Sequence, residues 1–281
     1  MTRGRITPAL AVLAAVIGIA GQAHAYVPPS EFIIKSMAAK KRGMNSIKVK
    51  SLVSEIQGDK PTGVRFRQTL TFDAQKNTVH RSAQDEQGRE LFVFERELGS
   101  SSEVVLPVDL LLLSARQSAV MESLRKREIP IKSEAELLKY ETEEERRSSE
   151  QVELSKLQPL TAGAGVLVAW VLAKDGLSGE GPRFWVEKDT FLPLRLSVRA
   201  EDAEVRFEGF RWVKEVPFPR VTELSMSRKI FAREEAQEIV VNGDAASATQ
   251  SGGVSAGFTE FGNCADSGLR DFIRRYYRLV K

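Results

Sequence analysis

The chain has 281 residues, of which 42% are hydrophobic and 28% are charged. Its 41 lysines and arginines nearly balance its 38 aspartates and glutamates, so the composition lacks the clustered positive charge typical of a nucleic-acid-binding protein, and we expect no nucleic-acid partner. The single cysteine, Cys264, excludes an internal disulfide. Its thiol is either buried or available to pair with another chain.

The first 25 residues have the three parts of a secretory signal peptide. Arg3 and Arg5 form a basic start, residues 9–21 form an apolar core, and residues 23–25 (AHA) form an A-x-A cleavage site. The apolar core is too short for a comfortable membrane span, although an uncleaved anchor is the alternative. We therefore expect cleavage after Ala25 and a soluble protein in an exported compartment, most simply a bacterial periplasm. No cysteine follows the cleavage site, which argues against lipid attachment there.

The next segment predicts one helix followed by an antiparallel meander. Ser30 can cap a helix that ends near Gly43. Residues 64–72 (VRFRQTLTF) alternate between apolar and polar side chains, which is typical of a strand with one buried face. Polar turns separate this strand from three further predicted strands, residues 47–56, 77–84 and 90–98.

Helices and a charged segment interrupt the meander. Pro107 suits a first helical position, and residues 107–129 predict one or two helices that lie against the sheet. Residues 133–150 are dense in charge, which favours a solvated helix or excursion, with an acidic docking surface as the alternative. Strands resume at residues 152–157 and 165–173.

The β pattern is strongest in the second half of the chain. Residues 183–198 (RFWVEKDTFLPLRLSV) predict two strands joined by a tight acidic turn. In the next predicted strand, residues 204–213, the apolar side chains change parity, and a bulge at Gly209 would restore their alignment. Residues 220–231 and 236–242 complete the predicted sheet.

Particular residues of this half carry a family resemblance. Trp185 and Asp189 lie around the hairpin turn, residues 191–195 (FLPLR) enter the next strand, and Pro217 and the pair 219–220 (PR) come later. With these features the chain resembles LolA-like proteins, the periplasmic lipoprotein-carrier superfamily that includes LolB-like proteins and anti-sigma-factor regulators. The resemblance extends over residues 30–242, and is more specific in the second half.

The resemblance implies an α+β domain, mainly antiparallel β, in which helices cover the concave face of a strongly curved, incomplete barrel. Together with the residue patterns of the two ends, it divides the chain into a signal peptide (1–25), a half-barrel domain (26–242), a Gly/Ser/Ala-rich linker (243–262) and a C-terminal amphipathic basic helix (263–281). The charged segment 133–150 and the residues after 242 depart from the family pattern. The resemblance also implies an apolar cavity between helices and sheet. Such a cavity would take lipid acyl chains or lipidated proteins out of water.

Apolar residues of the predicted strands are the candidates for the wall of this cavity. They are Phe66, Leu70, Phe72, Phe92, Phe94, Leu194, Leu196, Phe207, Trp212 and Met226. Arg65 and Arg195 are candidates for the cavity rim, where they would meet a lipid headgroup or a lipoprotein carbonyl. Packing in an ordinary filled core is the alternative for the apolar residues, and simple solvation is the alternative for the arginines.

The signs of an enzyme are weak. Residues 253–257 (GVSAG) match the G-x-S-x-G nucleophile motif, but Ser255 lies in the linker rather than between a strand and a helix. Once His24 leaves with the signal peptide, His80 is the sole histidine, far upstream in a predicted strand. One cysteine and one histidine are too few for the usual zinc sites. We therefore expect no enzymatic activity, no metal and no cofactor.

The last segment, residues 266–281, predicts an amphipathic helix with a basic polar side, because its apolar residues recur at helical spacing. This helix either docks on its own domain or makes transient contact with an anionic membrane or a membrane protein. Three function classes follow, in order of preference: a carrier of lipids or lipidated proteins, a regulator that binds a partner protein, and an envelope scaffold with a filled core.

Overall fold

The structure of the protein, a computed structural model, describes residues 28–99, 105–131, 155–162, 165–174, 181–243 and 266–280. The predicted signal peptide, the charged segment 133–150, residues 244–262 of the predicted linker, Ser255 and Cys264 lie outside the described residues.

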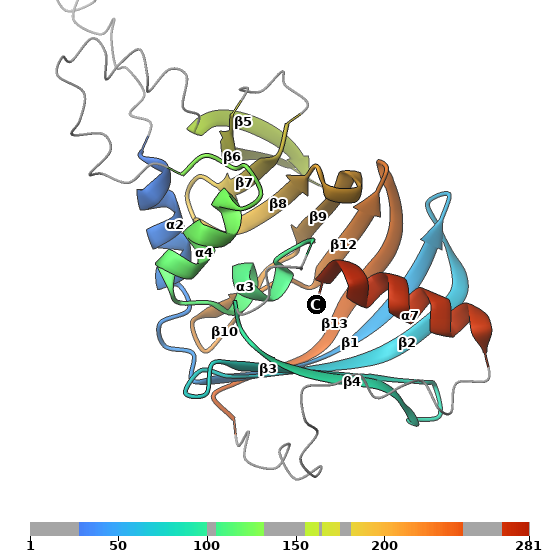
Figure 1. The fold of residues 1–281 in the computed structure, drawn as a ribbon. Helices are drawn as coiled ribbons and strands as arrows, with labels where there is room; N and C mark the ends of the chain where they lie inside the picture. The colour runs from blue at the N-terminus through green and yellow to red at the C-terminus, as the bar shows by residue number, and fades with distance from the viewer. Residues whose placement is uncertain are drawn as a thin grey trace, which may run out of the picture.

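Eleven strands form one antiparallel sheet in the order β4-β3-β2-β1-β13-β12-β9-β8-β7-β6-β5. Their bounds are β1 Ser46–Gln57, β2 Lys60–Asp73, β3 Thr78–Gln84, β4 Glu90–Glu97, β5 Ser155–Ala162, β6 Gly165–Ala173, β7 Arg183–Glu187, β8 Pro193–Val198, β9 Ala203–Glu208, β12 Val221–Met226 and β13 Lys229–Val241. The sheet curves strongly but does not close, since β4 and β5 form its two edges (Figure 1). The predicted fold class, a mainly antiparallel incomplete barrel, is confirmed.

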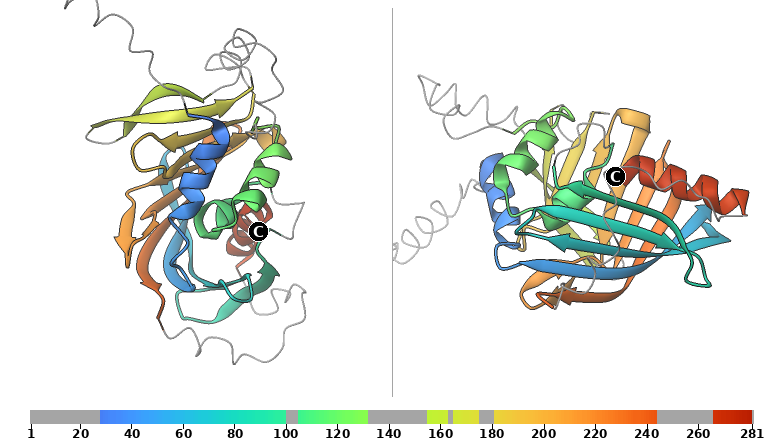
Figure 2. Two further views of the ribbon diagram at one scale, coloured as in Figure 1. Left: turned by 90° about the vertical axis from the view of Figure 1, so that its left-hand side faces the viewer. Right: turned by 60° about the horizontal axis from the view of Figure 1, so that its bottom comes forward.

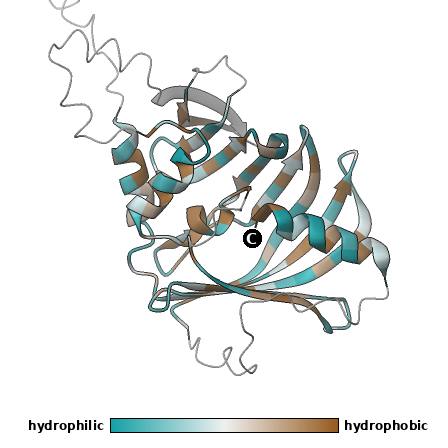
Figure 3. Ribbon diagram, viewed as in Figure 1, coloured by the Kyte–Doolittle hydropathy of each residue, from teal (hydrophilic) through white to brown (hydrophobic). Residues whose placement is uncertain are grey.

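Helices lie on the concave side of this sheet (Figure 2). Those in the described residues are α2 Ser30–Ala39, α3 Val108–Leu113, α4 Gln117–Arg125 and α7 Ser267–Val280, with a short 3-10 helix at Ala200–Asp202. Hydrophobic and hydrophilic residues alternate along the strands, and α7 turns a largely hydrophilic side outward (Figure 3). The apolar sides of helices and sheet therefore share one core.

The first helix differs in detail from the prediction. Pro29 occupies the N-cap position and Ser30 is the first helical residue, so the serine side chain makes no capping hydrogen bond. The helix ends at Ala39, before Gly43. In the segment 107–129, by contrast, the two predicted helices are confirmed as α3 and α4.

The predicted strand 204–213 with a bulge at Gly209 is wrong. The strand β9 ends at Glu208, and Gly209 has φ of +61°, a conformation that glycine adopts without steric cost and that here accompanies the departure of the chain from the sheet. The residues that follow form β10 (Arg211–Val213), which pairs with β11 (Val216–Phe218) in a separate hairpin. The change of parity in the sequence thus marks the end of a strand.

The predicted strand 220–231 is also divided. Ser227 and Arg228 both have positive φ, 48° and 63°, and form a two-residue turn between β12 and β13. Such left-handed pairs suit a tight hairpin because their twist matches that of the strands. Strand β13 lies between β12 and β1 and pairs with β1 along nearly its whole length. This pairing joins the two halves of the domain.

Candidate functional site

The concave face of the sheet is lined by apolar side chains because inward and outward residues alternate along each strand. The register places Phe66 opposite Val53 and Leu196 opposite Val205, so these pairs point to the same side. All four belong to one continuous hydrophobic cluster.

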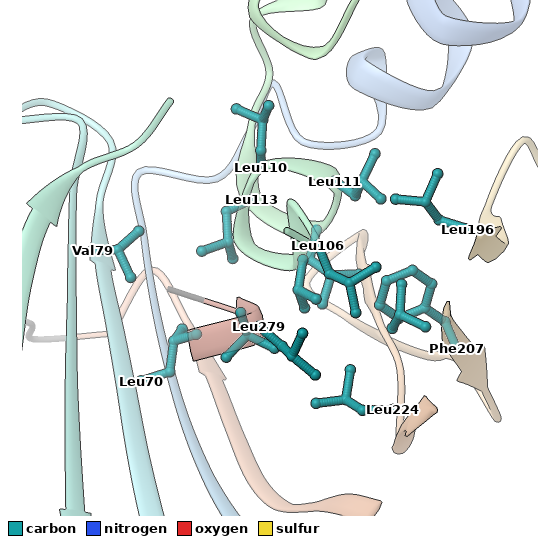
Figure 4. Close-up of a cluster of buried hydrophobic side chains, with 14 of the residues drawn as sticks. Leu70, Val79, Leu106, Leu110, Leu111, Leu113, Leu196, Phe207, Leu224 and Leu279 are labelled. Carbon is teal, nitrogen blue, oxygen red and sulfur yellow. The ribbon is translucent and has the colours of Figure 1, made fainter. Parts of the chain in front are cut away.

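The short helix α3 fills the middle of this face. Its residues Val108 to Leu113 are all buried. Figure 4 shows the surrounding cluster, in which side chains from strands, α3 and α7 converge: Leu70, Val79, Leu106, Leu110, Leu111, Leu113, Leu196, Phe207, Leu224 and Leu279. Because these side chains meet directly, this part of the concave face is packed as a core.

The C-terminal helix α7 fills the part of the face formed by β1 to β4. Its Tyr277 ring stacks on Phe92 with centroids 4.5 Å apart, and its Tyr276 ring meets Phe66 edge-on at 5.6 Å. Phe272 approaches Phe66 at 5.7 Å. Such aromatic pairs add to the stability that burial alone provides. The alternative in which the helix docks on its own domain is therefore the one observed.

A small cavity lies at the edge of the concave face, between the end of β4 and the helices α3 and α4. Its volume is about 70 Å³, and its lining includes Leu98, Pro107, Leu110 and Arg127. Pockets that bury small molecules usually have about 300–1,000 Å³. This cavity is too small for an acyl chain, since the helices occupy the space around it.

The structure brings most of the predicted wall residues together on the concave face. Those fully buried there are Phe66, Leu70, Phe72, Phe92, Leu196 and Phe207. Phe94 and Met226 are partly buried against the same cluster. In this conformation they pack as core residues against α3 and α7 or against each other.

Leu194 and Arg195 are not on the concave face. Trp185 pairs with Arg195 and Val186 pairs with Pro193, so Leu194 is an extra residue in β8, a bulge. A bulge changes the alternation locally. Leu194 consequently packs with Trp185 in a second hydrophobic cluster, separate from the core of the concave face.

The remaining candidates also lie away from the concave face. Trp212 is on the separate β10–β11 hairpin and is 52% exposed. Arg65 precedes the inward-facing Phe66 and so points outward, where its Nε lies 2.6 Å from Glu86 Oε1. Neither predicted rim arginine therefore borders the concave face.

Arg195 belongs instead to a groove of about 380 Å³ on the outer face, whose lining includes Arg183, Trp185, Arg195, Glu204, Arg206 and Arg228. Its guanidinium lies over the Trp185 ring at 4.5 Å and its Nη2 is 2.5 Å from Glu204 Oε2. Glu204 also pairs with Arg206 at 2.6 Å. Glu204 thus bridges two arginines that stand opposite each other on adjacent strands.

A buried polar cluster interrupts the apolar lining of the concave face. It consists of side chains from β2, β3, β13, α3 and α7, namely Gln68, Arg81, Glu234, Asp109, Tyr276 and Tyr277. Each of them is at most 8% exposed. Buried polar groups are costly unless they are paired, so the pairing within the cluster decides its effect.

Arg81 joins the sheet to α3 within this cluster. Its Nη2 and Nε both donate to the Asp109 carboxylate, and its Nη1 donates to Gln68 Oε1 at 2.8 Å. Arg96 supplies a second cation, with Nη2 2.9 Å from Asp109 Oδ2. Two strands thereby hold the carboxylate of α3.

The two tyrosines join α7 to the same cluster. Tyr277 donates its hydroxyl hydrogen to Gln68 Oε1 at 2.7 Å, and Tyr276 donates to Glu234 Oε2 at 2.5 Å. Gln68 Nε2 donates in turn to Glu234 Oε1 at 2.8 Å, and Ser51 donates to the same oxygen at 2.7 Å. The helix is thus fixed to the middle of the sheet.

The surroundings of the cluster keep its aspartate ionised and its tyrosine hydroxyls protonated. Burial by itself raises the pKa of Asp109. The positive charges of Arg81 and Arg96 lower this pKa by more than burial raises it, so the pKa lies below its ordinary value. Burial raises the pKa of both tyrosines well above the ordinary value, which keeps their hydroxyls protonated. Since the cluster is closed to solvent, it fastens helices to the sheet and has no access to a substrate in this conformation.

This cluster was not predicted from the sequence, although the residue pattern carries a signal of it. Gln68 has the same parity as Phe66 and Leu70, and Asp109 lies within the apolar run PVDLLLL. A polar residue at a position that the pattern assigns to the core needs a buried partner. Which partner it meets depends on the fold.

The described residues show neither a metal-ligand cluster nor a helix that could span a membrane. They contain no group of three or more His, Cys, Asp or Glu side chains placed to hold a metal ion. Among the helices of these residues, none is long and apolar enough to cross a membrane.

No family model and no curated protein matches the chain. Among solved structures, a LolA superfamily protein from Nitrosomonas europaea has a TM-score of 0.42 at 8% identity, covering 77% of this chain and 94% of the other.

Two other solved structures are also similar to the chain at a low TM-score. A domain from Vibrio parahaemolyticus, described as an outer membrane lipoprotein-sorting protein, has a TM-score of 0.36 at 10% identity and covers 88% of this chain and 97% of the other. The Pseudomonas aeruginosa MucA/MucB complex has a TM-score of 0.29 at 10% identity, covering 76% of this chain and 57% of the other. These similarities concern the fold and leave the ligand open.

Proposed function

We propose that the mature protein is a periplasmic carrier that holds acyl chains of lipids or of lipidated proteins on the concave face of its sheet. The observation that supports this is a continuous apolar concave face covered by helices that take no part in the pairing of the eleven strands. Burial of apolar carbon contributes about 0.8 kcal/mol per methylene. Binding of this kind needs neither a catalytic group nor a cofactor.

The outward side of α7 supports a transient contact with anionic membranes during loading or delivery. Its apolar side is buried, so the docked helix offers basic residues such as Arg270 and Arg274, the latter with a 59% exposed side chain. We expect this attraction to be electrostatic and to weaken as salt increases.

Native mass spectrometry of residues 26–281, isolated from an exported compartment, tests the carrier function directly. A bound species with acyl-chain mass, or uptake of an added palmitoylated peptide, would support it. The variant Phe94→Lys places a charge on a partly buried residue of the concave face and should lose the bound species. Val168→Lys is the matched control, because Val168 is already 38% exposed.

A protein that stays free of ligand and takes up no lipopeptide, while its circular dichroism shows it folded, would overturn the carrier proposal. The next measurement would then be a search for a stable complex with an exported protein, since a regulator forms one and a scaffold with a filled core does not.

A further inference from the structure

The helix α7 contributes nothing to the pairing of the sheet. All eleven strands bond to one another without it. Within the described part of the chain, the backbone hydrogen bonds between α7 and the rest of the domain are limited to one, from the Leu106 N–H to the Leu279 carbonyl at 2.8 Å. Departure of the helix would therefore leave every strand ladder intact.

The surface under α7 is the same surface that the carrier function needs. Tyr277 covers Phe92 and Phe94, at 4.5 Å and 5.5 Å between ring centroids, and Tyr276 covers Phe66. These three phenylalanines belong to the apolar lining of the concave face. An acyl chain on this part of the face and the docked helix exclude each other.

The helix α7 is attached to the polar cluster by specific hydrogen bonds, which can break and re-form. Its tyrosine hydroxyls bond to Gln68 and Glu234, which keep other partners within the sheet: Arg81 for Gln68, and Ser51 for Glu234. Water replaces the lost donors when the helix leaves, so each bond adds only a modest net stability. Two phenylalanines at these positions would keep the ring packing and would remove only the two hydroxyl bonds, while Gln68 and Glu234 keep their partners within the sheet.

We infer that α7 is the resident occupant of the concave face and that an acyl chain is loaded by displacing it. The inference rests on the proposed carrier function and names the regulation of the same site. The empty carrier keeps its apolar face covered by its own helix, and the ligand competes with that helix for the surface. The affinity for the ligand then depends on the difference between the free energy of ligand binding and the free energy of helix docking.

Hydrogen exchange of the full mature chain, with and without dansylundecanoic acid, tests the inference. Binding of this fluorescent fatty acid should increase amide exchange in residues 267–280 of the wild-type protein. The double variant Tyr276→Phe/Tyr277→Phe keeps both rings but loses both hydroxyl bonds. We expect it to bind the probe more tightly, on the order of a hundredfold, because the competing helix loses two hydrogen bonds, one of them to a carboxylate.

The control is Asp271→Asn, on the exposed side of the same helix, where the Asp271 side chain is 76% exposed; this variant should bind like the wild type. If the wild type binds the probe while α7 stays protected from exchange, the ligand lies elsewhere, and the inference is overturned although the carrier function stands. If neither the wild type nor the double variant binds the probe, the carrier function is itself overturned and the inference falls with it.

Discussion

Tyr276 on α7 and Glu234 on β13 are joined by a buried hydrogen bond of 2.5 Å between the tyrosine hydroxyl and Oε2 of the glutamate. The two residues are 42 positions apart in the sequence. This bond and its neighbour, from Tyr277 to Gln68, connect a terminal helix to the centre of a curved sheet. They make the buried polar cluster the point at which occupancy of the concave face is controlled.

The two tyrosines should differ in their contribution to stability. Tyr276→Phe removes a bond to a carboxylate and should lower the free energy of unfolding by about 1.5–3 kcal/mol, whereas Tyr277→Phe removes a bond to an amide and should cost about 0.5–1.5 kcal/mol. Urea unfolding of both variants measures the difference. A larger loss for Tyr277→Phe would contradict the pairing seen here.

The Arg81–Asp109 pair should behave as a unit. Asp109→Leu leaves the buried guanidinium without its carboxylate and should destabilise the protein by about 3–5 kcal/mol. The double variant Arg81→Met/Asp109→Leu should recover most of that loss, because neither charge then remains buried alone. A double-mutant cycle by chemical unfolding measures the coupling. Additive losses would mean that the two side chains act independently.

Lys41 should make stability depend on pH in the alkaline range. Its Nζ donates to the carbonyls of Met37 and Leu111, at 3.1 Å and 3.0 Å, and is buried between α2 and α3. Burial lowers the pKa of Lys41 from 10.5 to about 7. Between these values the unfolded chain binds more protons than the folded one, so the free energy of unfolding should rise with pH, by up to about 1.4 kcal/mol per unit.

Urea unfolding at pH 7, 8 and 9 is the measurement, with the pH values chosen inside the window that the shift from 10.5 to about 7 defines. The variant Lys41→Met should remove this part of the slope, and Lys35→Met, at an exposed position of the nearby helix α2, should keep it. Equal slopes in the wild type and Lys41→Met would show that Lys41 does not titrate in this range.

Phe207 and Trp212 are similar candidates for a cavity wall in the sequence. Their contributions to stability should nevertheless differ clearly. Phe207 is 2% exposed and Phe207→Ala should cost about 3–5 kcal/mol through the cavity it leaves. Trp212 is 52% exposed, and Trp212→Ala should change stability by less than about 1 kcal/mol. Thermal unfolding of the two variants compares them; a similar loss for both would place Trp212 in the core.

The strands and the antiparallel sheet were accessible from the sequence because alternation along a strand records which face is buried, whereas the incomplete barrel was implied by the family resemblance. Phe66, Leu70 and Phe72 show this directly. The same rule failed where the backbone departs from regular geometry. The bulge at Leu194 and the end of β9 before Gly209 depend on which strands pair, which a single strand does not reveal.

By itself, the sequence predicted the amphipathic helix that the structure has at Ser267–Val280, since helical spacing of apolar residues is a local property. Only the tertiary structure decided where that apolar side is buried. An amphipathic helix needs an apolar partner, and a membrane surface and a curved sheet both offer one. In this structure the helix docks on the sheet, where Gln68 and Glu234 accept hydrogen bonds from the two tyrosines. These acceptors stand opposite the tyrosines only because distant strands come together.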